Sequence, residues 1–156
     1  DIWGIKINEQ TKILAIASDK YQIRDEKILS ITTNTVTEIS NIGLPWSLSC
    51  IWFNNFSKTF VGGDGFYTKY NIQGYWNKIP LPLYYKFSIR GNRLNDIVLC
   101  GGLGYVGHFN GISWMNYLGN GLGEISGNYY LVSIKGNKIC AVGIADGKAV
   151  AIIGTR

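Results

Sequence analysis

Short runs of apolar residues recur along the chain, separated by turns rich in glycine and asparagine. In residues 13–16 and 97–100 the apolar side chains are consecutive, which is typical of a strand buried on both faces. In residues 76–79 and 114–117 apolar and polar side chains alternate, which indicates a strand with one exposed face. Residues 9–27, the best helix candidate, lack an apolar stripe at helical spacing. The pattern therefore predicts an all-β fold.

The predicted strands belong to a repeat. Gly62 and Gly101 lie 39 residues apart in similar Gly-Gly segments, and Trp76 and Trp114 lie 38 apart, each shortly after a glycine. A period of about 40 residues with four short strands is typical of one β-propeller blade. We therefore predict a propeller region over residues 1–156 with about four blades of four antiparallel strands. The predicted blades are residues 1–43, 44–82, 83–118 and 119–156.

The third unit shows the expected internal order most clearly, and residues 88–93 recur as residues 133–138, 45 positions later. Gly91-Asn92 and Asn110-Gly111 are predicted hairpin turns, since both residue types accept a positive φ. The four strands predicted for this unit are residues 85–89, 96–100, 105–109 and 113–118.

The fourth unit has fewer predicted strands than the others. Residues 143–156 supply its second and third strands, and no fourth strand follows. We expect a partial propeller, or one that closes by oligomerisation. An open arc leaves exposed edge strands, which proteins normally avoid, so self-association through open blade edges is part of this hypothesis.

Composition narrows the classes of partner. Charged residues make up only 16% of the chain, the net charge is +5, and the basic residues are scattered. A nucleic-acid binder normally concentrates its cations in one run or patch, so we predict no nucleic-acid partner. No stretch approaches the ~18 consecutive apolar residues of a membrane helix, so we predict no membrane span.

The chain has three cysteines, Cys50, Cys100 and Cys140, each within an apolar strand-like run. None belongs to a CxxC motif, and their odd number leaves at least one thiol unpaired within the chain. We predict that they are buried free thiols that pack as small hydrophobic residues. With one histidine in the chain, we predict no metal site and no cofactor.

Motifs that could carry catalysis have simpler explanations. Residues 102–107 match G-x-G-x-x-G, but a strand and not a helix follows, so these are predicted turn glycines. His108, the single histidine, lies within a predicted strand, at a position that we align with Lys69 in the second unit. Asp64 and Asp146 each precede glycine, as is usual in turns. We predict no catalytic residue.

Several short motifs point to a family. They are the opening Asp-Ile-Trp-Gly, the Val-Gly-Gly-x-Gly of residues 61–65, and the Gly-x-Ser-Trp of residues 111–114. In these motifs the chain resembles bacterial extracellular propellers, the repeat lipoproteins related to Asp-box (BNR-type) and photosystem II assembly-factor-like propellers. The Asp box itself is not intact, because Phe109 stands where its aspartate would be. The resemblance implies an extracellular, periplasmic or cell-surface scaffold that contacts proteins or glycans.

Trp46, Tyr84 and Tyr85 are the predicted ligand-binding residues, because they fall in linkers between blades, where binding surfaces usually form. Tryptophan and tyrosine suit both protein contacts and sugar stacking. The leading hypothesis is a non-enzymatic interaction scaffold of an exported propeller protein, with protein partners. The alternatives are a lectin-like propeller that uses these aromatic residues, and a degenerate hydrolase-type propeller with Arg90 or Arg93 and acidic residues in a central channel.

Overall fold

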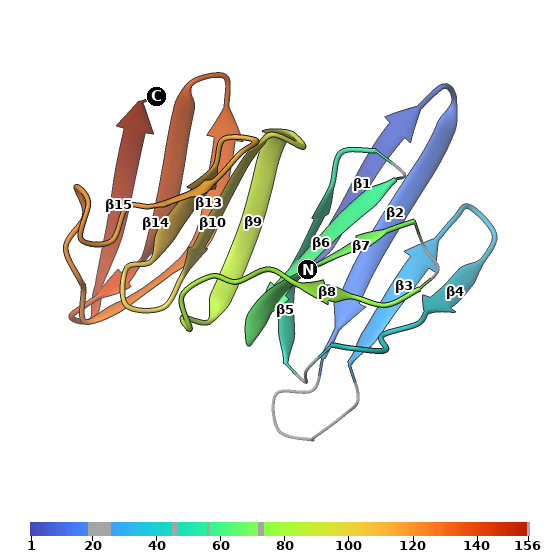
Figure 1. Cartoon of the computed structure of the whole chain (residues 1–156), viewed down its shortest axis with the longest axis horizontal. Coiled ribbons are helices and arrows are strands. Elements are labelled where there is room, and N and C mark those ends of the chain that lie inside the picture. The colour runs from blue at the N-terminus through green and yellow to red at the C-terminus, as the bar shows by residue number, and fades with distance from the viewer. Residues whose placement is uncertain (19–25, 45–46, 56, 72–73, 156) are drawn as a thin grey trace. The chain divides into compact units, whose positions relative to one another are not determined.

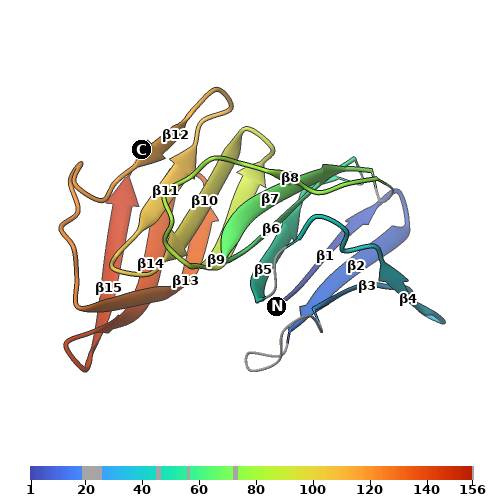
Figure 2. The same cartoon turned by 60° about the horizontal axis from the view of Figure 1, so that its bottom comes forward.

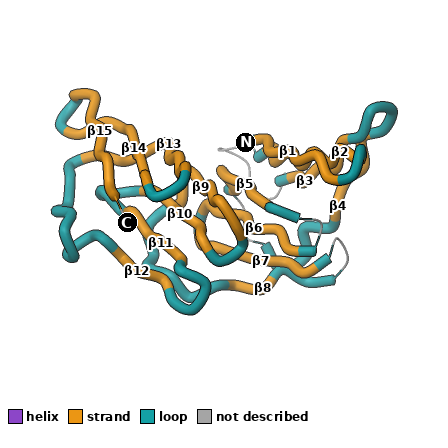
Figure 3. Tube along the Cα trace, turned by 90° about the horizontal axis from the view of Figure 1, so that it is seen from above, coloured by secondary structure: helices purple, strands orange, loops and turns teal. Residues whose placement is uncertain are grey.

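The computed structural model describes residues 1–18, 26–44, 47–55, 57–71 and 74–155. All regular secondary structure in these residues is β-strand, which confirms the all-β prediction (Figures 1 and 3). The strands form four antiparallel sheets, which we number in chain order. No helix in the described part of the chain is long and apolar enough to cross a membrane.

Within each sheet the strands pair in chain order, because each strand is joined to the next by a short connection. Sheet 1 consists of β1 Ile2–Ile7, β2 Gln10–Ala17, β3 Lys27–Ile31 and β4 Val36–Ile39. Sheet 2 consists of β5 Leu48–Phe53, β6 Lys58–Gly63, β7 Gly65–Tyr70 and β8 Asn77–Lys78. Sheet 3 consists of β9 Lys86–Arg93, β10 Asp96–Gly101, β11 Val106–Phe109 and β12 Trp114–Asn116. Sheet 4 consists of β13 Gly127–Lys135, β14 Lys138–Ala145 and β15 Lys148–Thr155.

The chain divides into two compact units, Asp1–Leu83 with sheets 1 and 2 and Tyr84–Arg156 with sheets 3 and 4. In the first unit, β5 packs against β1 and β2. Leu14 from β2 shares an apolar core with Ile51 and Phe53 from β5. Trp3 packs against this core, and its Nε1 donates a hydrogen bond to the Phe53 carbonyl oxygen at 2.8 Å.

The second unit repeats this packing. Its β13 packs against β9 and β10 (Figure 2). Val98 and Cys100 from β10 share a core with Tyr129 and Val132 from β13. In both units, therefore, the first strand of the later sheet covers the first two strands of the earlier sheet.

A β-bulge recurs in the first strand of sheets 2, 3 and 4. The extra residue is Ser49 in β5, Phe87 in β9 and Tyr130 in β13. A bulge bends the strand and increases its twist, and it also turns the side chains on either side of it to new directions. The same local distortion is therefore built into three sheets with different side chains.

A glycine faces the residue before each bulge, and a Cβ atom there would collide with a backbone carbonyl oxygen at the start of the paired first strand or directly before it. The three glycines are Gly63, Gly101 and Gly143. The structure therefore aligns Gly101 with Gly63 and not with Gly62, which corrects the sequence alignment by one residue. In the same way His108 corresponds to Thr68, not to Lys69.

The third predicted blade, residues 83–118, has its four strands close to the predicted positions, but its first turn differs. Gly91 and Asn92 lie within β9, and the chain turns at Leu94 and Asn95. The register of β9 against β10 shifts at Asn92, which accommodates the extra length. The hairpin of β13 and β14 has a two-residue turn instead, which lies at Gly136-Asn137. The predicted alignment of these two hairpins is therefore wrong by two residues along the first strand and by three at the turn.

The second predicted turn of this unit is a four-residue loop rather than a two-residue hairpin, since Phe109 pairs with Trp114. Asn110 begins the loop, and its Oδ1 accepts hydrogen bonds from the backbone N–H groups of Ile112 and Ser113, both at 2.9 Å. Gly111 has a φ of +97°, which glycine adopts without strain. The asparagine and glycine are thus turn residues, as predicted, in a longer turn.

Candidate functional site

Three aromatic rings form a row in the second unit. The rings of Tyr85 and Phe87 lie 4.8 Å apart between centroids, and those of Phe87 and Tyr130 lie 4.9 Å apart in an edge-to-face arrangement. Phe87 and Tyr130 are the two bulge residues, so the repeated bulge brings their rings together. The Tyr130 hydroxyl accepts a hydrogen bond from Asn128 Nδ2 at 3.1 Å, and Tyr130 is 41% exposed. The predicted site residue Tyr85 therefore belongs to an aromatic row that ends at the protein surface.

Beyond Tyr130 the row continues into an exposed apolar face of sheet 4. Side chains alternate along β13–β15, and one set packs against sheet 3 while the other set is exposed. Leu131 is 61% exposed, Ile144 47% and Val142 39%. Together with Tyr130 they line a shallow groove of about 390 Å³. We call the exposed side of sheet 4 the outer face. Tyr130, Leu131, Val142 and Ile144 are its exposed large side chains, and the lining of the groove is completed by Gly143, Ala149, Val150 and Ala151.

The outer face has the chemistry of a contact surface. None of its lining residues is charged, and its side-chain polar atom is the Tyr130 hydroxyl. Exposed contiguous apolar surface on a folded domain usually marks a place of protein contact. The apolar lining suits burial against a partner, with the Tyr130 hydroxyl as a polar group at its edge.

The other two predicted site residues do not join this row. Tyr84 packs on the buried ring of Tyr105, with centroids 5.5 Å apart. The ammonium group of Lys86 lies 5.1 Å from the Tyr105 centroid and donates a hydrogen bond to the Tyr84 carbonyl oxygen. Trp46 lies outside the described residues. Sequence reasoning missed Leu131, Val142 and Ile144, because an apolar run in a strand has the same pattern whether or not its second face is covered.

We predict that the second unit loses stability at alkaline pH, because the hydroxyl group of Tyr105 is buried. Burial raises the pKa of the Tyr105 hydroxyl well above its usual value, and burial also raises the pKa of Tyr129. Above about pH 10 the unfolded chain loses these protons first, so the free energy of unfolding falls as the pH rises further. We predict that Tyr105→Phe weakens this loss, measured as urea midpoints between pH 7 and pH 11. Parallel curves for the variant and the wild type would contradict the prediction.

A cluster of polar side chains in the second unit has a structural explanation. His108 Nε2 lies 2.8 Å from Asp96 Oδ1, and Asn92 Nδ2 donates to Asp96 Oδ2 at 2.8 Å. The same Asn92 amide donates to the Gly136 carbonyl oxygen at 2.9 Å, in the turn between β13 and β14. These contacts tie three strands of sheet 3 to sheet 4. The described residues contain no group of three histidine, cysteine or acidic side chains that could hold a metal ion.

The remaining sequence motifs agree with their structural explanations. Leu103 and Gly104 both have positive φ and form the turn that leads into β11, so the G-x-G-x-x-G segment opens a strand. The three cysteines are free, and Cys50 and Cys100 are buried while Cys140 is partly buried. Comparison with known proteins gives no further identification, since no family model, curated protein or solved structure matches the chain.

Proposed function

We propose that this protein is a non-enzymatic interaction module whose outer face binds a protein partner. The observation that carries this proposal is the exposed apolar groove of Leu131, Val142 and Ile144, continued by the aromatic row at Tyr130. Large apolar side chains around an aromatic anchor are the usual centre of a protein contact. Lys135, Lys138 and Lys148 stand at the turns of the same sheet, which favours a partner with acidic residues around an apolar patch.

We further propose that the four sheets are blades of a β-propeller-like repeat. Four features support this architecture: four-stranded meanders in three of the sheets, the chain-order pairing, the repeated bulges, and the packing of β5 and β13 on the first two strands of sheets 1 and 3. Placement outside the cell or at its surface is part of the proposal and rests on the family resemblance.

A lectin-like module is the second candidate, and the aromatic row of Tyr85, Phe87 and Tyr130 favours it, since sugars stack on such rings. Sugar sites also use several polar side chains to bind hydroxyl groups, and the lining of the outer face is mainly aliphatic. We therefore rank protein binding first. No observation on the described residues favours the hydrolase-type alternative.

The proposal predicts that Leu131→Asp abolishes partner binding while the protein stays folded, because Leu131 is an exposed residue at the centre of the groove. The wild type and the variant would be immobilised, and proteins retained from the source organism would be quantified. Ile112→Asp is the matched control, because Ile112 is 93% exposed in a loop away from the outer face. A partner lost with Leu131→Asp and kept with Ile112→Asp supports the proposal.

A glycan array with the wild type and Tyr85→Ala distinguishes the second candidate. Saturable glycan binding that Tyr85→Ala removes and Leu131→Asp preserves would replace protein binding by the lectin-like function. If Leu131→Asp and the wild type retained the same partners equally, the outer face would not be the binding site.

A further inference from the structure

The chain contains two Asn-Gly pairs, and both lie in exposed loops of the second unit. Asn110-Gly111 lies between β11 and β12, and Asn120-Gly121 lies between β12 and β13. An asparagine that precedes glycine is prone to spontaneous deamidation, because glycine has no side chain to hinder attack by its backbone nitrogen on the asparagine amide. Both asparagines are exposed, so the contacts within each loop decide which of the two pairs reacts.

The Asn110 side chain is held in one orientation by its own loop. Its Oδ1 accepts the hydrogen bonds from Ile112 and Ser113, and its backbone N–H donates to the Ser113 carbonyl oxygen at 3.2 Å. Gly111 lies against a neighbouring turn, since a Cβ atom built there would come within 2.7 Å of Asn95 Cβ. Ring closure requires the side-chain amide to turn and the Gly111 peptide group to rotate, and these contacts oppose both movements. Asn110 is therefore protected in the folded protein.

The Asn120 side chain has less support. Among the described residues it is held by one hydrogen bond, from its Nδ2 to the Asn116 carbonyl oxygen at 3.0 Å. That bond is made by the nitrogen that leaves in deamidation, so it does not fix the carbonyl side of the amide. Gly121 has a φ of +105°, and no heavy atom lies within 4 Å of a Cβ atom built there. The peptide group of Gly121 therefore has room to turn toward Asn120 Cγ.

We propose that Asn120-Gly121 is a site of spontaneous deamidation, at which Asn120 becomes a mixture of aspartate and isoaspartate and the loop around it loosens. The Gly121 backbone nitrogen attacks Asn120 Cγ and loses its proton. The new N–Cγ bond closes a five-membered succinimide ring, and the Nδ2 group leaves as ammonia. Water then adds to one of the two ring carbonyl carbons and breaks its bond to nitrogen. Opening at Cγ gives aspartate, and opening at the main-chain carbonyl carbon gives isoaspartate.

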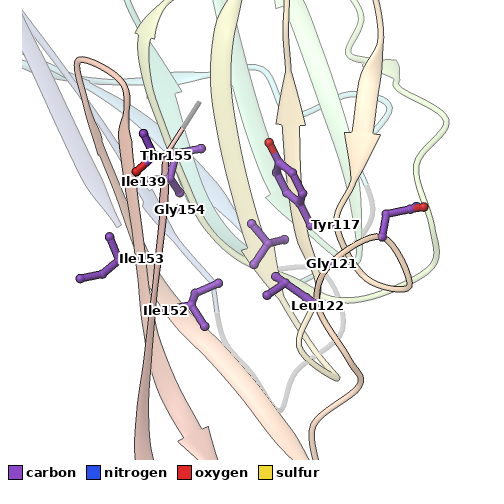
Figure 4. A pocket seen from close by; sticks show the side chains of 10 residues that line it. Tyr117, Gly121, Leu122, Ile139, Ile152, Ile153, Gly154 and Thr155 are labelled. Atoms are coloured by element: carbon purple, nitrogen blue, oxygen red, sulfur yellow. The ribbon is translucent and has the colours of Figure 1, made fainter.

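Isoaspartate disrupts the turn that positions Leu122. In this turn the N–H groups of Asn120 and Leu122 both donate to the Tyr117 carbonyl oxygen, at 2.8 and 3.0 Å. The Gly119 N–H donates to the Leu122 carbonyl oxygen at 2.8 Å. Isoaspartate adds a methylene group to the backbone inside the turn, so these hydrogen bonds cannot all keep their spacing. Leu122 packs against the core that contains Ile139, and Figure 4 shows it with Tyr117 at the wall of a pocket of about 300 Å³.

Incubation of the whole protein in water labelled with oxygen-18, at physiological pH and temperature, measures the reaction. Peptide mass spectrometry then gives the label taken up at each Asn-Gly pair, and fragmentation distinguishes isoaspartate from aspartate. We expect Asn120 to react roughly tenfold faster than Asn110, which corresponds to a difference of about 1.4 kcal/mol in activation free energy. In concentrated urea the loop contacts are lost, and the two pairs should react at similar rates.

Two substitutions at Asn120 separate the steps. Asn120→Gln keeps the amide but would require a larger ring, so it should take up no label at this site while Asn110 reacts as before. After conversion the wild type should melt about 4 °C lower than fresh protein, the shift expected from the loss of about one hydrogen bond in a unit of this size. Asn120→Gln incubated in parallel should keep its melting temperature. Fresh Asn120→Asp adds the negative charge without the extra methylene group, and it should melt close to fresh wild type.

Equal rates at the two pairs in the folded protein, or a faster reaction at Asn110, would overturn the assignment of the site. An unchanged melting temperature after conversion of Asn120 would overturn the proposed loosening of the loop. Leu131→Asp, on the outer face, should deamidate at the rate of the wild type, so this proposal and the proposed function can fail separately.

Discussion

Replacing Gly101 with alanine is expected to lower the free energy of unfolding of the second unit by about 3 kcal/mol or more. A Cβ atom at this position would collide with the Tyr85 carbonyl oxygen. That oxygen also accepts a hydrogen bond from Gly102 N–H at 3.0 Å, so it is held in place. The backbone would have to move at the bulge that directs Phe87. Urea unfolding followed by circular dichroism measures the change.

Gly123→Ala is the matched control for Gly101→Ala. No heavy atom lies within 4 Å of a Cβ atom built at Gly123, and its φ is not in the left-handed region. The same substitution should therefore change the free energy of unfolding by no more than about 0.5 kcal/mol. Equal losses in the two variants would show that the bulge glycine has no special role, and that alanine is simply unfavourable at both positions.

Trp76→Ala is expected to cost the first unit about 3–5 kcal/mol of unfolding free energy, the usual range for deleting a large buried aromatic side chain. The indole is 6% exposed, fills the end of the core, and loses its hydrogen bond to Ser40. The neighbouring Lys69 would also lose the ring that lies 5.4 Å from its ammonium group. The measurement is the urea midpoint, converted with the slope of the transition.

Tyr75→Ala provides the comparison on the adjacent residue. Tyr75 is 72% exposed, so its loss should cost less than about 0.5 kcal/mol. If Trp76→Ala were as mild as Tyr75→Ala, the indole would not be a wedge between sheets 1 and 2.

The sequence predicted the strands well where patterns are local. The apolar run of residues 97–100 and the alternation after Trp114 each fall in a strand of sheet 3, since side-chain period and turn residues act over a few positions. The 38-residue spacing of Trp76 and Trp114 also matches their places beside the fourth strands of sheets 2 and 3.

The bulges and the exposed face of sheet 4 could not be predicted from the sequence, because both depend on residues that are distant along the chain. The bulges at Phe87 and Tyr130 add one residue on one strand only, and this shift cannot be seen without knowing the partner strand. The exposure of Val142 and Ile144 depends on which elements cover sheet 4, whereas their sequence resembles that of the covered strand β10. This is why the sequence singled out Tyr85 but not the apolar face to which its aromatic row leads.

The recurring bulge also constrains how this repeat can change in evolution. Ser49 is small and polar whereas Phe87 and Tyr130 are aromatic, so the bulge does not require one kind of side chain. It does require the extra residue, because deleting one residue there would turn every preceding side chain of the strand to the opposite face. Insertions and deletions are expected instead in the connections, which already differ in length, as the single residue Asp64 and the four residues 110–113 show. The repeat therefore tolerates substitution at the bulge and changes of length only at the turns.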